Sequence, residues 1–252
     1  MMKPLFGVFA LAAGLAYAGP INYADFSSTA GLNLVGTATQ SGALLQLTSN
    51  AGGQVGAAWF STQIDVANGF STSFSYTFSN GSGIPADGIA FVIQNSAAGT
   101  GALGISGFGL GASTINNAVA IAFRNYIYKD VEVAACGAGN NVSIPGCLVG
   151  STSSQTLYGT HNVQINYNPG TLVIILDGTQ ILSDSINLAS AMNLTSGKYA
   201  YVGFTGATGG EVETQTINSW QLSLPEPGTF GLVSVFALGL IGLARRRQAQ
   251  KK

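Results

Sequence analysis

The sequence predicts an all-β domain built as an antiparallel sandwich, and three observations lead to this fold class. Polar and apolar residues alternate with a period of two over several segments, as they do in half-buried strands. Between residues 19 and 224, no convincing stretch has the apolar spacing of an amphipathic helix. Gly, Ser and Asn separate the alternating segments, and the 35 glycines are about twice the average usage. The 206 residues of this region suit one sandwich domain with a full core.

The clearest strand is predicted at 70–78, where aromatic residues share one parity and hydroxyl residues share the other. Such a segment packs one face against a core and turns the other toward solvent. Segments 161–167 and 171–176 are predicted to form a hairpin, because Asn168, Pro169 and Gly170 make a turn between them. Further strands are predicted at 43–48, 88–94, 118–123, 199–205 and 214–222.

The N-terminus predicts export. Lys3 provides a short positive region, residues 5–15 are apolar, and Ala16, Tyr17 and Ala18 form a small-residue cleavage pattern before Gly19. We therefore expect residues 1–18 to be a signal peptide and residues 19–224 to be the folded domain.

The C-terminus carries a second export signal at residues 225–252. Pro225, Glu226 and Pro227 precede an apolar span at 228–244 and a basic tail at 245–252, and three arginines open this tail. The 17-residue span lies near the short limit for a membrane helix, and the arginines favour a cytoplasmic chain end. This order resembles the PEP-CTERM sorting signal, which implies transient membrane insertion, processing by an exosortase, and an envelope or extracellular destination. A permanent anchor is the alternative.

Charge and cysteine content limit the classes of function that the domain can have. The domain at 19–224 holds three basic and nine acidic residues, a net charge of −6, so no basic patch exists for nucleic acid. Cys136 and Cys147 enclose a short polar loop and are predicted to form a disulfide in an oxidising compartment. Two free thiols are the alternative, and zinc is disfavoured because the only histidine, His161, is far along the chain.

The order of five segments resembles the legume-type, or L-type, lectin family. The matching segments are A-D-G-I-A-F-V at 86–92, G-F-G-L-G at 107–111, N-A-V-A-I-A-F at 117–123, the hairpin at 161–178, and Y-V-G-F at 201–204 with I-N-S-W at 217–220. The resemblance covers most of residues 70–222. It implies a concanavalin-like jelly roll that recognises carbohydrate at one set of loops.

The resemblance fails at the family's metal site. Two acidic ligands in the family correspond here to Ala122 and Arg124, a methyl group and a cation, neither of which can bind a hard metal ion. The family's next ligands align near Tyr128 and Asn141. We therefore expect no family-type metal and no cofactor. A calcium ion held elsewhere by residues such as Asp130, Glu132 and Asn140 stays an alternative.

By this resemblance, the carbohydrate-binding residues are Asp87, Gly109, Arg124 and Asn141. The planar guanidinium of Arg124 can bind a carboxylate through two hydrogen bonds, and Asp87 is the expected partner. Such a pair would either order Asp87 for a ligand or consume it in a structural salt bridge. Asp87 as a turn cap, and Gly109 as a turn glycine, are the structural alternatives.

Catalysis has little support in the sequence. The pairs Asp130 with Glu132 and Glu211 with Glu213 are interpreted as exposed strand acids rather than as a glycosidase pair. His161 lacks a recognisable nucleophile and is expected to be a buried, satisfied histidine.

Trp59 and Trp220 are expected in the core. The predicted function is non-catalytic binding of a glycan, for example an exopolysaccharide. A structural surface or matrix protein with a degenerate lectin fold is the alternative.

Overall fold

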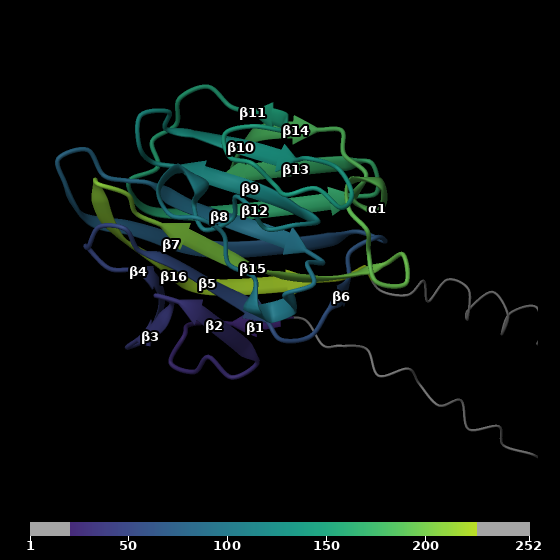
Figure 1. Ribbon diagram of the computed structural model, residues 1–252, viewed down its shortest axis with the longest axis horizontal. Coiled ribbons are helices and arrows are strands. Elements are labelled where there is room, and N and C mark those ends of the chain that lie inside the picture. Colours follow the sequence, from purple (N-terminus) through teal and green to yellow (C-terminus); the bar gives the residue numbers. More distant parts are fainter. Residues whose placement is uncertain (1–20, 226–252) are drawn as a thin grey trace, which may run out of the picture.

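The computed structural model describes residues 21–225, which form two stacked antiparallel sheets (Figure 1). The predicted all-β antiparallel sandwich is confirmed. The predicted signal peptide at 1–18 and the sorting signal beyond Pro225 lie outside the described residues. Within residues 21–225, no helix has the length and hydropathy that a membrane span requires.

Each sheet has eight strands, and we call them the first and the second sheet. The first sheet has the order β14 (Thr179–Asp184), β13 (Thr171–Leu176), β12 (Gly159–Asn168), β7 (Phe70–Ser82), β16 (Val212–Ser223), β4 (Leu44–Thr48), β3 (Thr39–Ser41), with β1 (Ile21–Tyr23) beside β16. The second sheet has the order β11 (Leu148–Ser151), β10 (Asp130–Ala135), β9 (Ala118–Arg124), β8 (Gly88–Gln94), β15 (Tyr199–Ala207), β5 (Val55–Phe60), β2 (Leu32–Gly36), with β6 (Ile64–Asp65) beside β15. Helical segments are short: η1 (Gly99–Gly101), η2 (Gly107–Gly109) and α1 (Leu188–Ala191).

All the strands predicted from the sequence are present, and the predicted hairpin is β12 paired with β13. Alternation in β7 has the expected result, because its aromatic side chains point into the space between the sheets, whereas Ser71, Ser73, Ser75 and Thr77 lie on the opposite face. Phe74 and Phe204 meet there with ring centroids 4.9 Å apart, and Phe204 lies 5.0 Å from Trp220. Truncating one of these buried aromatics to alanine would cost about 3 to 5 kcal/mol.

A second apolar layer covers the outer face of the second sheet, so β8 and β9 are buried along their whole length. The covering residues come from the loops at 95–117 and 136–147. On the sheet, this face carries mostly alanines, whose small side chains leave room for the loops to pack closely. The alanines are Ala57, Ala90, Ala118, Ala120, Ala122 and Ala134. Trp59 is fully buried in this layer and donates to the Ala102 carbonyl at 2.8 Å, which confirms its predicted core position.

The disulfide between Cys136 and Cys147 is present, as predicted. It closes the loop that follows β10, and Gly146 and Ile144 within this loop contact other parts of the second sheet's cover. We call residues 136–147 the cystine loop.

The described chain enters and leaves the sandwich at one end. Ile21 pairs with Leu222, and Ser223 pairs with Ser71 near the start of β7. The loop that carries Asp87 follows the other end of β7. Since β7 runs 13 residues, at about 3.3 Å per residue, the Asp87 loop lies roughly 40 Å from that end.

Candidate functional site

Asp87 lies in the loop between β7 and β8, immediately before Gly88 pairs with Arg124. Its backbone is fixed on both sides: its amide donates to the Ala207 carbonyl at 3.1 Å, and its carbonyl accepts from the Asn125 amide at 2.8 Å. The peptide bond between Ala86 and Asp87 is cis. Only 4% of Asp87 is exposed, and its Oδ2 atom is buried without a hydrogen-bond partner. A buried acceptor with a fixed backbone and a vacant lone pair can receive a hydrogen bond from a ligand.

Two glycines pack close to this carboxyl. A Cβ atom on Gly209 would lie 3.1 Å from Asp87 Oδ2, and one on Gly107, where φ is +63°, would lie 4.0 Å away. Burial raises the pKa of Asp87 to about 6, and the neighbouring Gly209 amide offsets part of this rise. Asp87 is therefore ionised at neutral pH, with little solvent to satisfy it.

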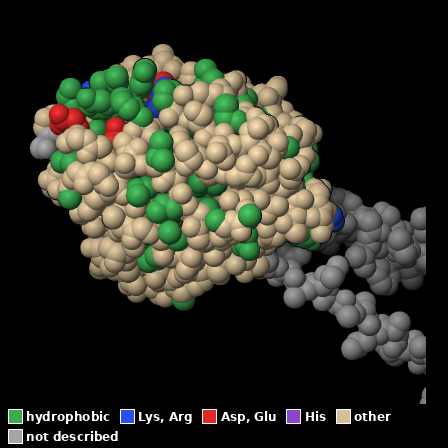
Figure 2. Space-filling model, in the orientation of Figure 1, with side chains coloured by type: hydrophobic (Ala, Val, Ile, Leu, Met, Phe, Trp, Pro, Cys, Tyr) green, Lys and Arg blue, Asp and Glu red, His purple; other side chains and the backbone are tan. Residues whose placement is uncertain are grey.

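Aromatic side chains form a rim at the same end of the molecule. Phe108, next to Gly107, lies 5.4 Å from the ring of Tyr126 and 6.1 Å from the ring of Tyr128. Phe108 is 41% exposed and Tyr128 is 47% exposed. Figure 2 shows hydrophobic side chains gathered at the upper left, beside acidic and basic ones, where β9 ends and β10 begins in Figure 1. Exposed rings beside a carboxylate can stack on the apolar face of a sugar.

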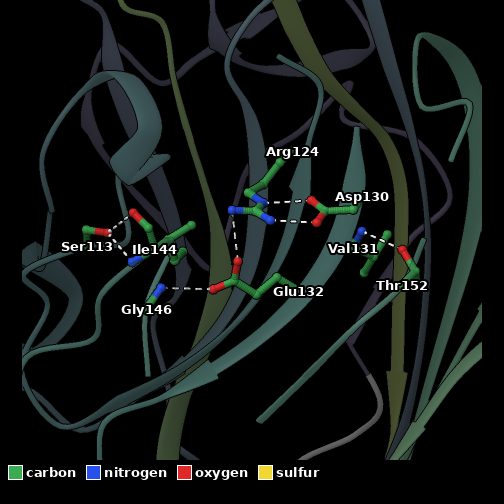
Figure 3. Close-up of polar contacts among 8 residues, drawn as sticks. All are labelled: Ser113, Arg124, Asp130, Val131, Glu132, Ile144, Gly146 and Thr152. Atoms are coloured by element: carbon green, nitrogen blue, oxygen red, sulfur yellow. Dashed lines mark hydrogen bonds and ion pairs between the residues drawn. The ribbon is translucent and has the colours of Figure 1, made fainter. Parts of the chain in front are cut away.

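Arg124 does not contact Asp87, and in this respect the sequence-based hypothesis is wrong. Figure 3 shows its guanidinium directed at strand β10, where Nε and one terminal nitrogen donate to Asp130 at 2.7 and 2.6 Å. The other terminal nitrogen lies 3.0 Å from Glu132. The physical reason is register: Asp130 lies directly opposite Arg124 across the β9–β10 pair, and Glu132 is diagonal to it. We call Arg124, Asp130 and Glu132 the ion cluster.

The acids of the ion cluster are buried, which corrects their interpretation as exposed strand acids. Asp130 is 9% exposed and Glu132 is 2% exposed, because the covering loops exclude water from this face. Burial alone would lower the pKa of Arg124, but its bonds to Asp130 and the charge of Glu132 outweigh burial and raise it. Arg124 therefore stays charged, and Tyr128 stacks over its guanidinium at 4.3 Å.

Hydrogen bonds connect the ion cluster to both covering loops, as Figure 3 shows. Gly146 of the cystine loop donates to Glu132 at 3.4 Å. Within the same loop, the Ile144 amide donates to the Ser113 hydroxyl at 2.8 Å, and this hydroxyl donates to the Ile144 carbonyl at 3.3 Å. Since Ser113 belongs to the loop that carries Gly107 and Phe108, the ion cluster and the disulfide hold the loops around Asp87.

A second buried acid, Glu213, lies behind Asp87, and it too was interpreted as exposed. It is fully buried, because β16 turns it into the space between the sheets. Asn125 links the two acids: its side-chain amide donates to Glu213 at 2.6 Å, and its backbone amide donates to the Asp87 carbonyl. Burial raises the pKa of Glu213 to about 7, the amides of Asn125 and Gln215 oppose this rise, and the charge of Asp87 adds to it.

Gly109 and Asn141, the other two predicted site residues, are placed differently. Gly109 is buried, its amide donates to the Ser106 carbonyl at 3.3 Å, and a Cβ atom there would lie 2.4 Å from Ile105. It occupies a tight turn, while Gly107 lies nearer to Asp87. Asn141 pairs with Asn116, just before β9 begins, whereas Asp87 lies beside the end of β9.

The residues at the family's metal positions do not fit a metal ion. Ala122 presents a methyl group to the covering loops, and the Arg124 guanidinium already neutralises the two nearest carboxylates. Over residues 21–225, no group of three or more His, Cys, Asp or Glu side chains is arranged to hold a metal. The arginine thus supplies the positive charge between the strands.

Glu211 is partly exposed whereas Glu213 is enclosed in the sandwich, so the two do not face a common cleft. His161 bonds to Asp177 at 2.7 Å at the base of the β12–β13 hairpin, and its side chain is 12% exposed, so it is a satisfied histidine as expected.

Asn125, Glu213, Gly107, Gly209 and the aromatic rim were missed in the sequence. One signal was available, since Glu213 and Gln215 occupy the parity of Ile217, which points inward. Another was the run of large apolar and aromatic residues Tyr126, Ile127 and Tyr128 shortly after the predicted strand at 118–123.

Comparisons with solved structures place this fold among plant lectins. The lectin from Bauhinia forficata, solved in complex with GalNAc, has a TM-score of 0.65 and 22% identity over 81% of this chain and 96% of its own. Lectin II from Ulex europaeus has a TM-score of 0.64 and 22% identity over 81% and 97%. Arcelin-5 from Phaseolus vulgaris, a lectin-like defense protein, has a TM-score of 0.64 and 21% identity over 81% and 96%.

Among curated proteins, the search found no match to this sequence. The family model of the legume lectin domain matches residues 20–229, which is most of the chain. This match and the two-sheet sandwich confirm the resemblance inferred from the motifs at 86–92 and 117–123. The chain belongs to the legume lectin domain family.

Proposed function

We propose that this protein is a non-catalytic glycan-binding protein whose site at Asp87 works without the metal ions of its family. The observation that carries the proposal is the Asp87 carboxyl, buried and fixed by its backbone, with an unpartnered Oδ2 facing two glycines. A sugar hydroxyl that donates to this oxygen would form a charge-assisted hydrogen bond. Phe108 and Tyr126 would cover the sugar's apolar face.

The ion cluster supports binding without metal. In place of cations between the strands, Arg124 neutralises Asp130 and Glu132, and Glu132 accepts a hydrogen bond from Gly146 of the cystine loop. The net charge of −6 over residues 19–224 favours neutral over acidic glycans, because an anionic chain would be repelled.

A glycan array tests this proposal. The purified protein is applied with calcium and with excess EDTA, and Asp87→Asn serves as the matched control because it keeps the shape of the side chain. We expect retention of neutral glycans under both conditions and its loss in the variant. Retention only with calcium, or equal retention by the variant, would show that the site is wrong.

A structural surface or matrix protein is the second candidate function. The observation that favours it is the 4% exposure of Asp87, which leaves a ligand only a narrow approach. Arcelin-5, which shares this fold at 21% identity, is a lectin-like defense protein. Absence of retention on the array by a folded wild-type protein would support this reading.

Export, sorting through Pro225, Glu226 and Pro227, and surface display in the cell envelope are proposed from the sequence alone. An anchor following Pro225 would leave Asp87 at the far end of the sandwich, directed away from the membrane. Mass spectrometry of the envelope fraction tests processing. Mature protein should lack residues beyond about 228, and abundant peptides from 233–244 would show a permanent anchor.

A further inference from the structure

A chain of buried polar groups leads from Asp87 into the interior of the sandwich. Glu213 and Gln215 are both fully buried, and Gln215 donates to Glu213 at 3.2 Å and to the Ala207 carbonyl at 2.8 Å. The Ala207 carbonyl also accepts from the Asp87 amide, so Asp87 and Gln215, the partner of Glu213, bond to the same residue of β15. Asn125 closes the connection through its side chain to Glu213 and its backbone to Asp87.

Within residues 21–225, no ion pair with a Lys or Arg side chain involves either of these two acids. The basic residues of the described chain are Arg124, Lys129 and Lys198, and Arg124 is committed to Asp130 and Glu132. A lectin site that needs only a hydrogen-bonding carboxylate has no use for a second carboxyl behind it, and a buried, unpaired acid is costly to keep. The placement of Glu213 therefore requires a role.

We propose that Asn125 and Glu213 are positioning residues for Asp87, and that proton uptake by this buried pair of carboxyls makes the site release its glycan as the medium turns acidic. The inference rests on the proposed function, because it concerns the regulation of the same site. Ionised Asp87 accepts from sugar hydroxyls with both oxygens, whereas protonated Asp87 has lost its charge. Asn125 connects the two residues, since its side-chain amide donates to the Glu213 carboxyl and its backbone amide donates to the Asp87 backbone carbonyl.

The surroundings of the pair set the pH range. Burial raises the pKa of Asp87 to about 6 and that of Glu213 to about 7, and the charge of Asp87 adds to the rise at Glu213. The other groups facing Glu213 are the Asn125 and Gln215 amides and the phenol of Tyr76. Burial raises the pKa of Tyr76, and the charges of Asp177 and Glu213 add to this rise. Near Asp87 lie the amide of Gly209 and, across Gly88, the ion cluster.

Carboxyl titration by NMR tests the inference in the purified protein, without a ligand. In protein labelled with ¹³C at aspartate and glutamate, the Asp87 carboxyl should titrate near pH 6. The Glu213 carboxyl should titrate near pH 7, and in Asp87→Asn it should titrate at lower pH, because the charge of Asp87 that raises its pKa is gone. Glu211→Gln is the matched control, two residues away on the same chain segment and partly exposed, and should leave both carboxyls unchanged. An Asp87 midpoint near 4, or a Glu213 midpoint that Asp87→Asn does not move, would overturn the inference.

Binding supplies the second readout. On a printed array of neutral glycans, wild-type affinity should fall about ten-fold from pH 7.5 to pH 5.0, the loss expected when only the ionised form of a group of pKa about 6 binds. Equal affinity at both pH values would contradict the inference. Absence of retention at every pH would refute the proposed function instead, while the NMR titration would still decide whether the two carboxyls are coupled.

Discussion

Two buried acidic groups lie on either side of the end of β9, and only one of them contains a cation. The ion cluster places Asp130 and Glu132 within 3.0 Å of the Arg124 guanidinium. Asp87 and Glu213, on the other side, are connected only by amides. These buried carboxyls thus differ in whether a cation compensates their charge, and the difference depends on which residue the sheet register places opposite each acid.

The comparison assigns a structural role to one group of acids and a binding role to the other. In the ion cluster the charges are compensated, so its role is to hold strands and loops together. The Asp87 pair is uncompensated and costs stability at neutral pH, which is typical of a group retained for binding. Substitutions should therefore have opposite effects in the two groups.

The largest effect is expected from Arg124→Ala. Removal of the guanidinium leaves two buried carboxylates unpaired, and breaking a buried pair in this way costs about 3 to 5 kcal/mol of unfolding free energy. Arg124→Lys should lose less, because charge is kept while the two-bond geometry is lost. Urea denaturation at pH 7.5 measures both. A loss of unfolding free energy below about 1 kcal/mol in Arg124→Ala would contradict the stabilising role of the ion cluster.

Reduction of the disulfide should have the next largest effect. The bridge joins residues 11 apart, and such loops stabilise by about 2 to 4 kcal/mol in the chain-entropy model. Because Gly146 of this loop contacts Glu132, reduction should loosen the ion cluster as well. Thermal denaturation with and without reductant measures the change, and Cys136→Ser with Cys147→Ser is the matched variant. An unchanged melting temperature would contradict the predicted stabilisation by the disulfide.

Acidification should stabilise the fold even as it weakens binding. Asp87 and Glu213 have pKa values raised in the folded state to about 6 and about 7, so the folded protein binds more protons than the unfolded chain. Their contribution is present below about pH 4 and is lost as the pH rises to about 7. Between pH 7.5 and 5.0 the gain should be on the order of 2 kcal/mol, discounted for partial exposure.

The pH profile of the melting temperature checks this prediction, and Glu213→Gln should flatten it. A wild-type profile that falls on acidification over the same range, with no difference between wild type and variant, would contradict the uncompensated state of the pair.

The smallest effect on stability is expected from Asp87→Asn. Replacing an uncompensated buried carboxylate by a neutral amide of the same shape should raise the unfolding free energy at pH 7.5 by about 1 kcal/mol. The same substitution in the ion cluster, Asp130→Asn, should lower it. Parallel urea titrations of the two variants measure both changes in unfolding free energy. Changes of the same sign would contradict the predicted difference between the two groups.

The fold could be predicted because the alternation of polar and apolar residues along a strand can be recognised in the sequence. Phe74 and Tyr76 alternate with serines, and β7 follows from that pattern alone. The strand β5 at Val55–Phe60 was missed because its interior is buried on both sides and does not alternate. Asp130 and Glu132 were expected on an exposed strand, and the burial of β10 was missed because a distant loop covers the face that Glu132 occupies.

The site was predicted only in part. Motifs identified Asp87 and Arg124, but their pairing depends on which strand lies opposite, and the β9–β10 register gives Asp130 to Arg124. Asn141 was placed by its alignment with a metal ligand of the family, whereas the cystine loop takes it to the other end of β9. Glu213 was judged exposed because polar residues usually face solvent. Its inward parity was the better guide.

Calorimetric titration of an array-selected glycan into the protein tests the central claim most directly: Asp87 binds carbohydrate while Arg124 replaces the family's ions. We predict the same affinity with calcium and with excess EDTA, and a loss of at least about thirty-fold in Asp87→Asn, since removing one partner of a buried charged hydrogen bond costs about 2 to 5 kcal/mol. Affinity abolished by EDTA, or wild-type affinity in a folded Asp87→Asn protein, would contradict the claim.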